Sequence, residues 1–188
     1  MGEAIACDDG LVKKLGTGWT VAACVLWDRD RGPQRIAHLP IHVDGLDATS
    51  QLLFIVRHLA SHASSLDAVF FDSVTIGGFN IVSIPSIYRG VTAPVIVVYK
   101  RRPRWDRIRR ALYEHFPDYE IRLRVVSIVR SASAVHTREG ILYVVAWGAD
   151  MESARRLIER YQMGSRVPEP LRFAHLYASA LSRLLIHY

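Results

Sequence analysis

The spacing of hydrophobic residues along the chain predicts both strands and helices. Continuous apolar runs rich in β-branched and aromatic residues are typical of buried strands. Strands are therefore predicted at Ala4–Cys7, Trp19–Trp27, Gln34–Val43, Ala68–Phe71, Pro94–Tyr99, Ile121–Val129 and Gly140–Trp147. Only short turns separate the first three, so we expect them to form an antiparallel meander.

Apolar residues spaced three or four apart predict helices between and after these strands. Leu52, Val56 and Leu59 follow this spacing after the cap-forming oxygens of Asp47–Ser50, and the helix should end near Ser61–Ser65. Further helices are predicted within Asn80–Gly90, where Pro85 interrupts a short one, at Arg101–Phe116, from Asp150 to about Tyr161, and at Leu171–Ile186. Ser131–Thr137 and Gly164–Pro170 are expected to be loops.

The order of these elements predicts an α/β fold. Three antiparallel strands followed by alternating helices and strands indicate a mixed sheet with parallel β-α units and helices on both faces. The chain has 188 residues, and no repeat, linker or low-complexity segment divides it. We therefore expect one domain over residues 1–188.

Composition excludes two broad classes. Half of the residues are hydrophobic, which excludes a disordered chain, and no uncharged apolar run is long enough to span a membrane. The first ten residues do not resemble a signal peptide, so we expect a cytoplasmic protein with no membrane partner. Cys7 and Cys24 lie in predicted strands without a CxxC motif, and we expect both to be buried, reduced thiols.

The charge favours a polyanionic partner. The formal net charge is +6, and all but three of the 24 basic residues are arginine, whose planar fork suits phosphate. The alternative explanations for the excess of arginine are ion-pair networks and genome composition. The densest cluster begins with Lys100, Arg101, Arg102 and Arg104. It is interpreted either as a solvated basic face or as a surface that binds the phosphates of DNA or RNA.

Acidic residues follow two predicted strands at the points where they end. Asp8 follows the first strand, and Asp72 follows the fourth. If those strands are neighbours and parallel, both carboxylates point into one crevice, where Mg²⁺ or Mn²⁺ would offset their repulsion. Lys100, at the end of the next strand, would add a positive charge, whereas Asp9 should point to the opposite face.

A glycine-rich loop comes shortly after Asp72. Gly77, Gly78 and Asn80 are candidates for binding a phosphate or a nucleic acid. The alternative is structural: Asp72 caps a turn, and the glycines supply positive φ angles.

Several longer motifs together resemble one family. They are CDDG from residue 7, VDGLDAT from 43, FFDSVTIGGFN from 70, PVIVVYKRRP from 94 and SRVPEPLRFAHLYASAL from 165. In these stretches the chain resembles an archaeal family of endonuclease V-like proteins of unknown function, within the ribonuclease H-like superfamily. The resemblance covers most of the chain and implies a ribonuclease H-like mixed sheet.

The resemblance also implies roles for individual residues. Asp8 and Asp72 match the metal-binding aspartates of the nuclease, and Lys100 matches its lysine. The last metal position falls on His175, which would act as a ligand or proton shuttle. A glutamate at the start of the first helix falls near Ala48, which leaves the adjacent Asp47 as a further candidate ligand or as a helix cap.

Two functions from different classes follow. The first is a divalent-metal-dependent phosphodiesterase that acts on DNA or RNA, including damaged or deaminated substrates. The second is a nucleic-acid-binding protein that keeps the nuclease fold but has weakened catalysis, because Ala48 and His175 reduce the negative charge of the site. A third is a site for a small phosphorylated ligand beside the glycine-rich loop.

Overall fold

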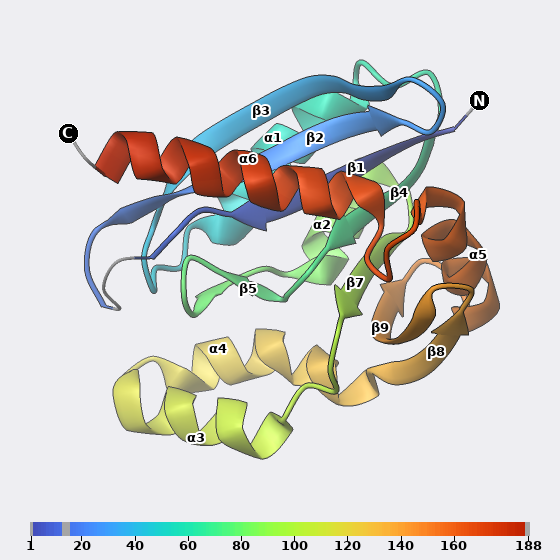
Figure 1. The fold of residues 1–188 in the computed structure, drawn as a ribbon. Helices are drawn as coiled ribbons and strands as arrows, with labels where there is room; N and C mark the ends of the chain where they lie inside the picture. Colours follow the sequence, from blue (N-terminus) through green and yellow to red (C-terminus); the bar gives the residue numbers. More distant parts are fainter. Residues whose placement is uncertain (1, 13–15, 187–188) are drawn as a thin grey trace.

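A twisted seven-stranded sheet forms the centre of the computed structural model, which describes residues 2–12 and 16–186 (Figure 1). Its strand order is β3-β2-β1-β4-β7-β9-β8. The strands are β1 (Glu3–Asp9), β2 (Trp19–Asp28), β3 (Gly32–His42), β4 (Leu66–Phe71), β7 (Val95–Tyr99), β8 (Ser133–Thr137) and β9 (Gly140–Trp147). A separate small ribbon pairs β5 (Thr75–Ile76) with β6 (Asn80–Ile81).

Helices cover both faces of this sheet. They are α1 (Ala48–Ala60), α2 (Ile84–Val91), α3 (Trp105–His115), α4 (Tyr119–Val126), α5 (Met151–Tyr161) and α6 (Glu169–Ile186), with a 3₁₀ turn, η1 (Ser127–Ser131). In Figure 1, α6 crosses one face over β1 and β2, whereas α3 and α4 project together beyond the end of β7. No helix within the described part of the chain is long and apolar enough to cross a membrane.

The predicted mixed sheet is confirmed. β1, β2 and β3 form the antiparallel meander, and β1, β4 and β7 are parallel neighbours. The last two strands of the sheet do not continue this parallel pairing, because β9 pairs antiparallel with both β7 and β8.

The predicted strand at Ile121–Val129 is wrong, because this segment forms α4 and η1. Arg122, Val126 and Val129 are buried and lie four and three residues apart, whereas Ile121 is more than half exposed. The spacing is helical, but consecutive apolar residues hid it. The predicted loop at Ser131–Thr137 is also wrong: most of it is β8, which pairs with β9.

Pro85 begins a helix rather than interrupting one. It lies in the first turn of α2, where its missing N–H costs no hydrogen bond. The other helices follow the predicted order. Asp150 caps α5 as expected, since its side chain accepts a hydrogen bond from the Ser153 backbone N–H at 2.7 Å.

The core is divided into two layers by the alternation of side chains along the central strands. Ile5 and Phe71 belong to the layer covered by α1, α2 and η1, whereas Ala6 and Phe70 belong to the layer covered by α5 and α6. Because β1, β4 and β7 are covered on both faces, their central residues, Ala4–Cys7, Ala68–Phe71 and Val95–Val98, are all apolar.

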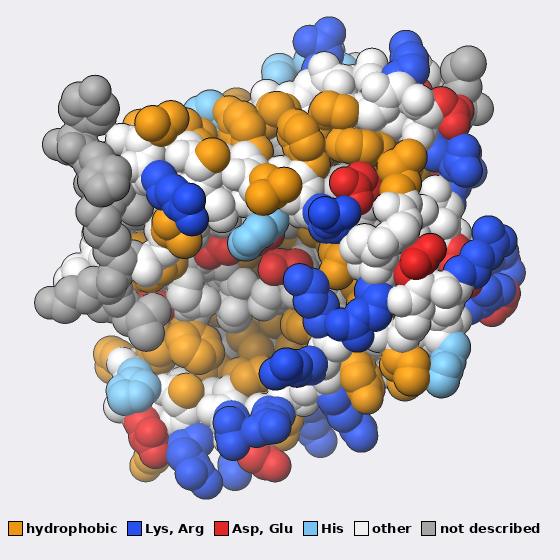
Figure 2. Space-filling view, viewed as in Figure 1, with side chains coloured by type: hydrophobic (Ala, Val, Ile, Leu, Met, Phe, Trp, Pro, Cys, Tyr) orange, Lys and Arg blue, Asp and Glu red, His pale blue; other side chains and the backbone are white. Residues whose placement is uncertain are grey.

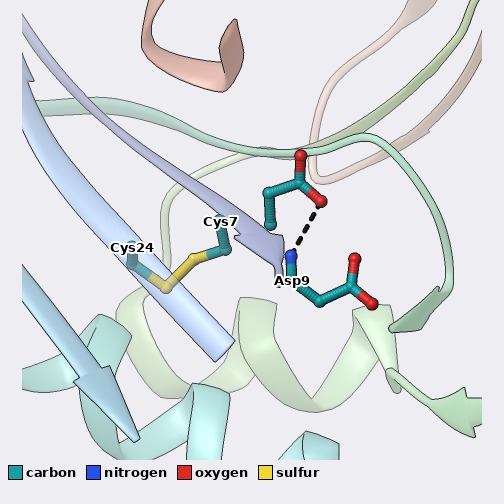
Figure 3. The surroundings of a disulfide bond; sticks show 4 residues. Cys7, Asp9 and Cys24 are labelled. Atoms are coloured by element: carbon teal, nitrogen blue, oxygen red, sulfur yellow. Dashed lines mark hydrogen bonds between the residues drawn. A yellow bond between two sulfur atoms is a disulfide. The ribbon is translucent and has the colours of Figure 1, made fainter. Parts of the chain in front are cut away.

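The prediction of reduced thiols is wrong. Cys7 and Cys24 face each other on β1 and β2 and form a disulfide, which lies beside Asp9 (Figure 3). Each cysteine lies in an apolar run, as expected, but only the strand register brings the two sulfur atoms together.

We predict that the double variant Cys7→Ala, Cys24→Ala is less stable than the wild type by about 3 kcal/mol, because the disulfide closes a loop between residues 17 apart. Denaturant unfolding measures the difference. Wild-type protein unfolded in a reductant should lose a similar amount, and equal stability of variant and oxidised wild type would contradict the prediction.

Candidate metal and nucleic-acid site

Five of the predicted site residues, Asp8, Asp72, Lys100, Arg101 and His175, line one cleft at the carboxyl edge of the parallel strands. Asp8 comes from the end of β1, Asp72 follows β4, Lys100 follows β7, and His175 lies on α6. The cleft has a volume of about 630 Å³. Figure 2 shows a hollow above the α3–α4 part of the molecule, with acidic side chains on its floor and Lys and Arg side chains along its rim.

Asp8 is the most enclosed polar group of this cleft. Its side chain is only 4% exposed, and its Oδ1 accepts a hydrogen bond from the Asp9 backbone N–H at 2.7 Å. Its Oδ2 lies 2.9 Å from Nδ1 of His175, whose side chain is 62% exposed. Asp8 therefore orients a histidine ring that remains accessible from the cleft.

The acidic groups strongly perturb one another. Burial and the carboxylates of Asp72 and Asp9 raise the pKa of Asp8 to about 9. Loss of surrounding water and the Asp9 carboxylate raise the pKa of Asp72 to about 6. Asp72 still has solvent-exposed surface, so its carboxylate is accessible from the cleft. Lys100 offsets only part of this negative charge.

This donor set fits a divalent cation. Carboxylate oxygens are preferred ligands of Mg²⁺ and Mn²⁺, and Mg²⁺ is often held by one or two carboxylates together with water and substrate oxygens. Asp8 and Asp72 supply two carboxylates, and His175 supplies an adjacent nitrogen. Across residues 2–12 and 16–186, no three His, Cys, Asp or Glu side chains form a ready-made metal cage.

Basic residues border the acidic floor. Arg101 lines the cleft beside Lys100, as do Arg166, in the loop before α6, and Arg172 on that helix. Sequence reasoning missed the last two, although both lie in the SRVPEPLRFAH stretch that also contains His175. Arg102 and Arg104 are exposed but do not line the cleft.

Asp47 does not join the acidic group, so its predicted metal role is not supported. Its carboxylate instead lies 2.9 Å from Nδ1 of His42 and accepts a 2.6 Å hydrogen bond from Asn80. It does not cap α1 either: the Asn80 side chain accepts the hydrogen bond from the Ala48 N–H at 2.9 Å. A cap supplied from a distant strand could not be found by local sequence reasoning.

The glycine-rich loop is used structurally. The Gly77 N–H donates to the Asp9 carboxylate, and the Phe79 N–H donates to Asp44 at 2.6 Å. Asn80 is completely buried, so the prediction that it contacts nucleic acid is wrong. Gly77 is also buried, and Gly78 is half-buried with a positive φ of 83°. Asp9 faces this loop, away from Asp8, as strand alternation predicts.

A buried arginine on α4, Arg122, anchors this loop. Arg122 binds both carboxylate oxygens of Asp118 at 2.9 Å and donates to the carbonyl oxygens of Asp44, Gly45 and Phe79 at 2.7–3.0 Å. All five guanidinium N–H groups therefore have a partner. Through Phe79 and Asp44, Arg122 fixes the loop that binds Asp9.

Comparison with known proteins identifies the family. The profile of the family described as "Endonuclease dU" matches residues 2–182. The chain belongs to the endonuclease dU family. It is 43% identical over 185 residues to the "UPF0215 protein" of Aeropyrum pernix, an alignment that covers 96% of this chain and 98% of that protein. The predicted membership of an archaeal endonuclease V-like family is thereby confirmed.

Solved structures give the same fold. A protein of unknown function from Archaeoglobus fulgidus is similar with a TM-score of 0.83 and 26% identity, over 96% of this chain and 98% of that one. Endonuclease V from Ciona intestinalis, bound to DNA that contains an inosine, is similar with a TM-score of 0.61 and 12% identity, over 98% of this chain and 86% of that one. This chain therefore shares the fold of endonuclease V.

We predict that the stability of the metal-free protein falls as the pH rises from about 4 to about 9. Over this range the folded protein keeps protons on Asp8 and Asp72 that the unfolded chain releases, because both pKa values are raised above 3.8. Urea unfolding in a chelator at several pH values measures the trend. Asp8→Asn should flatten it, and identical pH profiles for the two proteins would contradict the assignment.

We also predict that Arg122→Gln lowers the free energy of unfolding by about 3 kcal/mol or more, since it leaves buried carbonyl oxygens and Asp118 without their partner. Arg124→Gln, an exposed substitution on the same helix, is the matched control and should change stability little. Equal effects of the two substitutions in thermal and denaturant unfolding would show that the buried contacts contribute nothing.

Proposed function

We propose that this protein is a divalent-metal-dependent phosphodiesterase that cleaves nucleic acid. The observation that carries the proposal is the meeting of Asp8 and Asp72, both with raised pKa values, in one cleft with Lys100 and His175. Carboxylates that repel one another beside basic side chains suit a site where a cation and a phosphate bind together. The shared fold with endonuclease V supports the same class of reaction.

The side chains then have distinct roles. Asp8 and Asp72 would hold the cation, which supplies positive charge to the oxygens of the phosphodiester when it is bound. Lys100 and Arg101 would bind phosphate oxygens next to it. His175, oriented through Nδ1 by Asp8, would move a proton at its other ring nitrogen, between water and the leaving oxygen.

The substrate we propose carries a deaminated base. The family description names dU, and the similar endonuclease V from Ciona intestinalis binds DNA that contains an inosine. Uracil and hypoxanthine are the deamination products of cytosine and adenine, so both descriptions point to the same chemical class. DNA with deoxyuridine is the first substrate to test, followed by DNA and RNA with inosine.

A nucleic-acid-binding protein with weakened catalysis is the second candidate. It is favoured by Ala48, which is buried where the resemblance expects a glutamate, and by Asp47, which is bound to His42 and Asn80 away from the cleft. With only two carboxylates lining the cleft, the cation would be held less tightly than by a larger acidic set.

A cleavage assay separates the two candidates. We predict that the wild type with Mg²⁺ or Mn²⁺ cleaves DNA that contains deoxyuridine, and that Asp72→Ala lowers the rate at least about 100-fold, because charge stabilisation worth several kcal/mol is lost. Asp30→Ala, an exposed acid on the β2–β3 turn, is the matched control and should retain full activity.

Three results of this assay differ in meaning. Activity that survives Asp72→Ala would assign the cleavage to another site or a contaminant. Binding without cleavage across deoxyuridine, inosine and mismatch substrates would support the second candidate. Neither binding nor cleavage of any DNA or RNA would reject both.

A further inference from the structure

Two exposed aromatic rings are stacked on one another at the end of the β2–β3 hairpin. Trp19 begins β2, His42 ends β3, and the two residues are direct partners in the strand register. Their ring centroids are 3.5 Å apart with an angle of 37° between the planes. Trp19 is 55% exposed and the His42 side chain 53% exposed, so part of the surface of this pair is open to solvent.

A polar network anchored by the buried Asn80 holds the His42 ring of this stack in place. The Asp47 carboxylate accepts hydrogen bonds from the His42 backbone N–H at 3.3 Å and lies 2.9 Å from its Nδ1. Asp47 is itself bound at 2.6 Å by Asn80, which is completely buried and also donates to the His42 carbonyl oxygen. The ring of His42 is therefore oriented before any ligand arrives, which reduces the entropy lost on binding.

The stack lies on the same side of the sheet as the acidic cleft. Asp8 pairs with Ala23 in the register of β1 and β2, and Trp19 lies four residues farther along β2. Residues an even number apart share a face, so Trp19 and Asp8 lie on one side of the sheet. Four residues of strand span about 13 Å, on the order of four stacked nucleotides at about 3.4 Å each.

The local charge disfavours phosphate at this position. Asp47 contacts His42 directly, and the side chain of Asp44, two residues beyond His42, accepts hydrogen bonds from Gly16 and Phe79. Two carboxylates next to the stack would repel a phosphate group. The flat, uncharged face of a base has no such penalty, and aromatic rings stack with any base.

We propose that the Trp19–His42 pair is a stacking platform for one unpaired base of the nucleic acid that occupies the cleft. Trp19 contributes the contact surface, and His42, Asp47 and Asn80 position it. This inference rests on the proposed function, because it assumes that nucleic acid occupies the cleft. It concerns the binding of that nucleic acid and not its cleavage. It assigns Asp47 a positioning role in place of metal binding.

Binding of single-stranded DNA tests the platform in excess chelator, so that no cleavage occurs. Trp19→Ala should weaken binding about 5- to 100-fold, the range for loss of one stacked base, and leave the dependence of affinity on salt unchanged. Lys100→Gln should instead reduce the slope of log affinity against log salt by about 0.7. Trp147→Ala, which removes a tryptophan that is 42% exposed on β9, is the matched control and should bind like the wild type.

A second measurement uses tryptophan fluorescence. DNA should quench the emission of the wild type and of Trp147→Phe, but not that of Trp19→Phe, which should retain most of the affinity because phenylalanine also stacks. Circular dichroism of each variant verifies folding.

The outcomes distinguish this inference from the proposed function. Equal affinity of Trp19→Ala and wild type, or a loss of affinity that changes the salt slope, would overturn the stacking platform. If the wild type binds DNA but never cleaves it, and Trp19→Ala binds more weakly, the stacking platform is upheld and the nuclease function is rejected. A wild type that binds no DNA would overturn both.

Discussion

The repulsion between Asp8 and Asp72 is the constraint on which this site depends. Both carboxylates are brought to one edge by the parallel pairing of β1 with β4, and burial of Asp8 removes the water that would screen them. The protein leaves this charge only partly compensated, by Lys100 and the neighbouring arginines. The proposed binding of a cation together with a phosphate would relieve this unfavourable arrangement.

Hydrogen bonds and a disulfide hold the loops and strands around these acids at the carboxyl edge of the sheet. Arg122 donates to the carbonyl oxygens of two loops, and one of them, the glycine-rich loop, donates to the carboxylates of Asp9 and Asp44. The disulfide between β1 and β2 lies directly behind the acids. Polar groups that other proteins leave free for ligands, such as glycine-loop N–H groups, are here used to hold the loops.

The likeness to endonuclease V concerns the fold, whereas the details of the site are this chain's own. Asp47 and Ala48 stand near the start of α1, where an additional acid would complete a larger carboxylate set, yet Asp47 is bound to His42 and Asn80. These hydrogen bonds position the His42 ring against Trp19. Nearby residues of one fold can thus support different contacts to the same class of ligand.

The antiparallel meander, the parallel strands that follow it and the acids at their ends could be predicted from the sequence, because strand periodicity and strand-end polarity are local properties. It failed at Ile121–Val129, where consecutive apolar residues hid a helical spacing, and at Cys7 and Cys24, whose bond depends on register. The folded structure was needed to show that Asn80 caps α1, that Arg122 anchors the loops, and that Trp19 contacts His42. Those contacts join residues that are distant in sequence, and no local pattern of residue types encodes them.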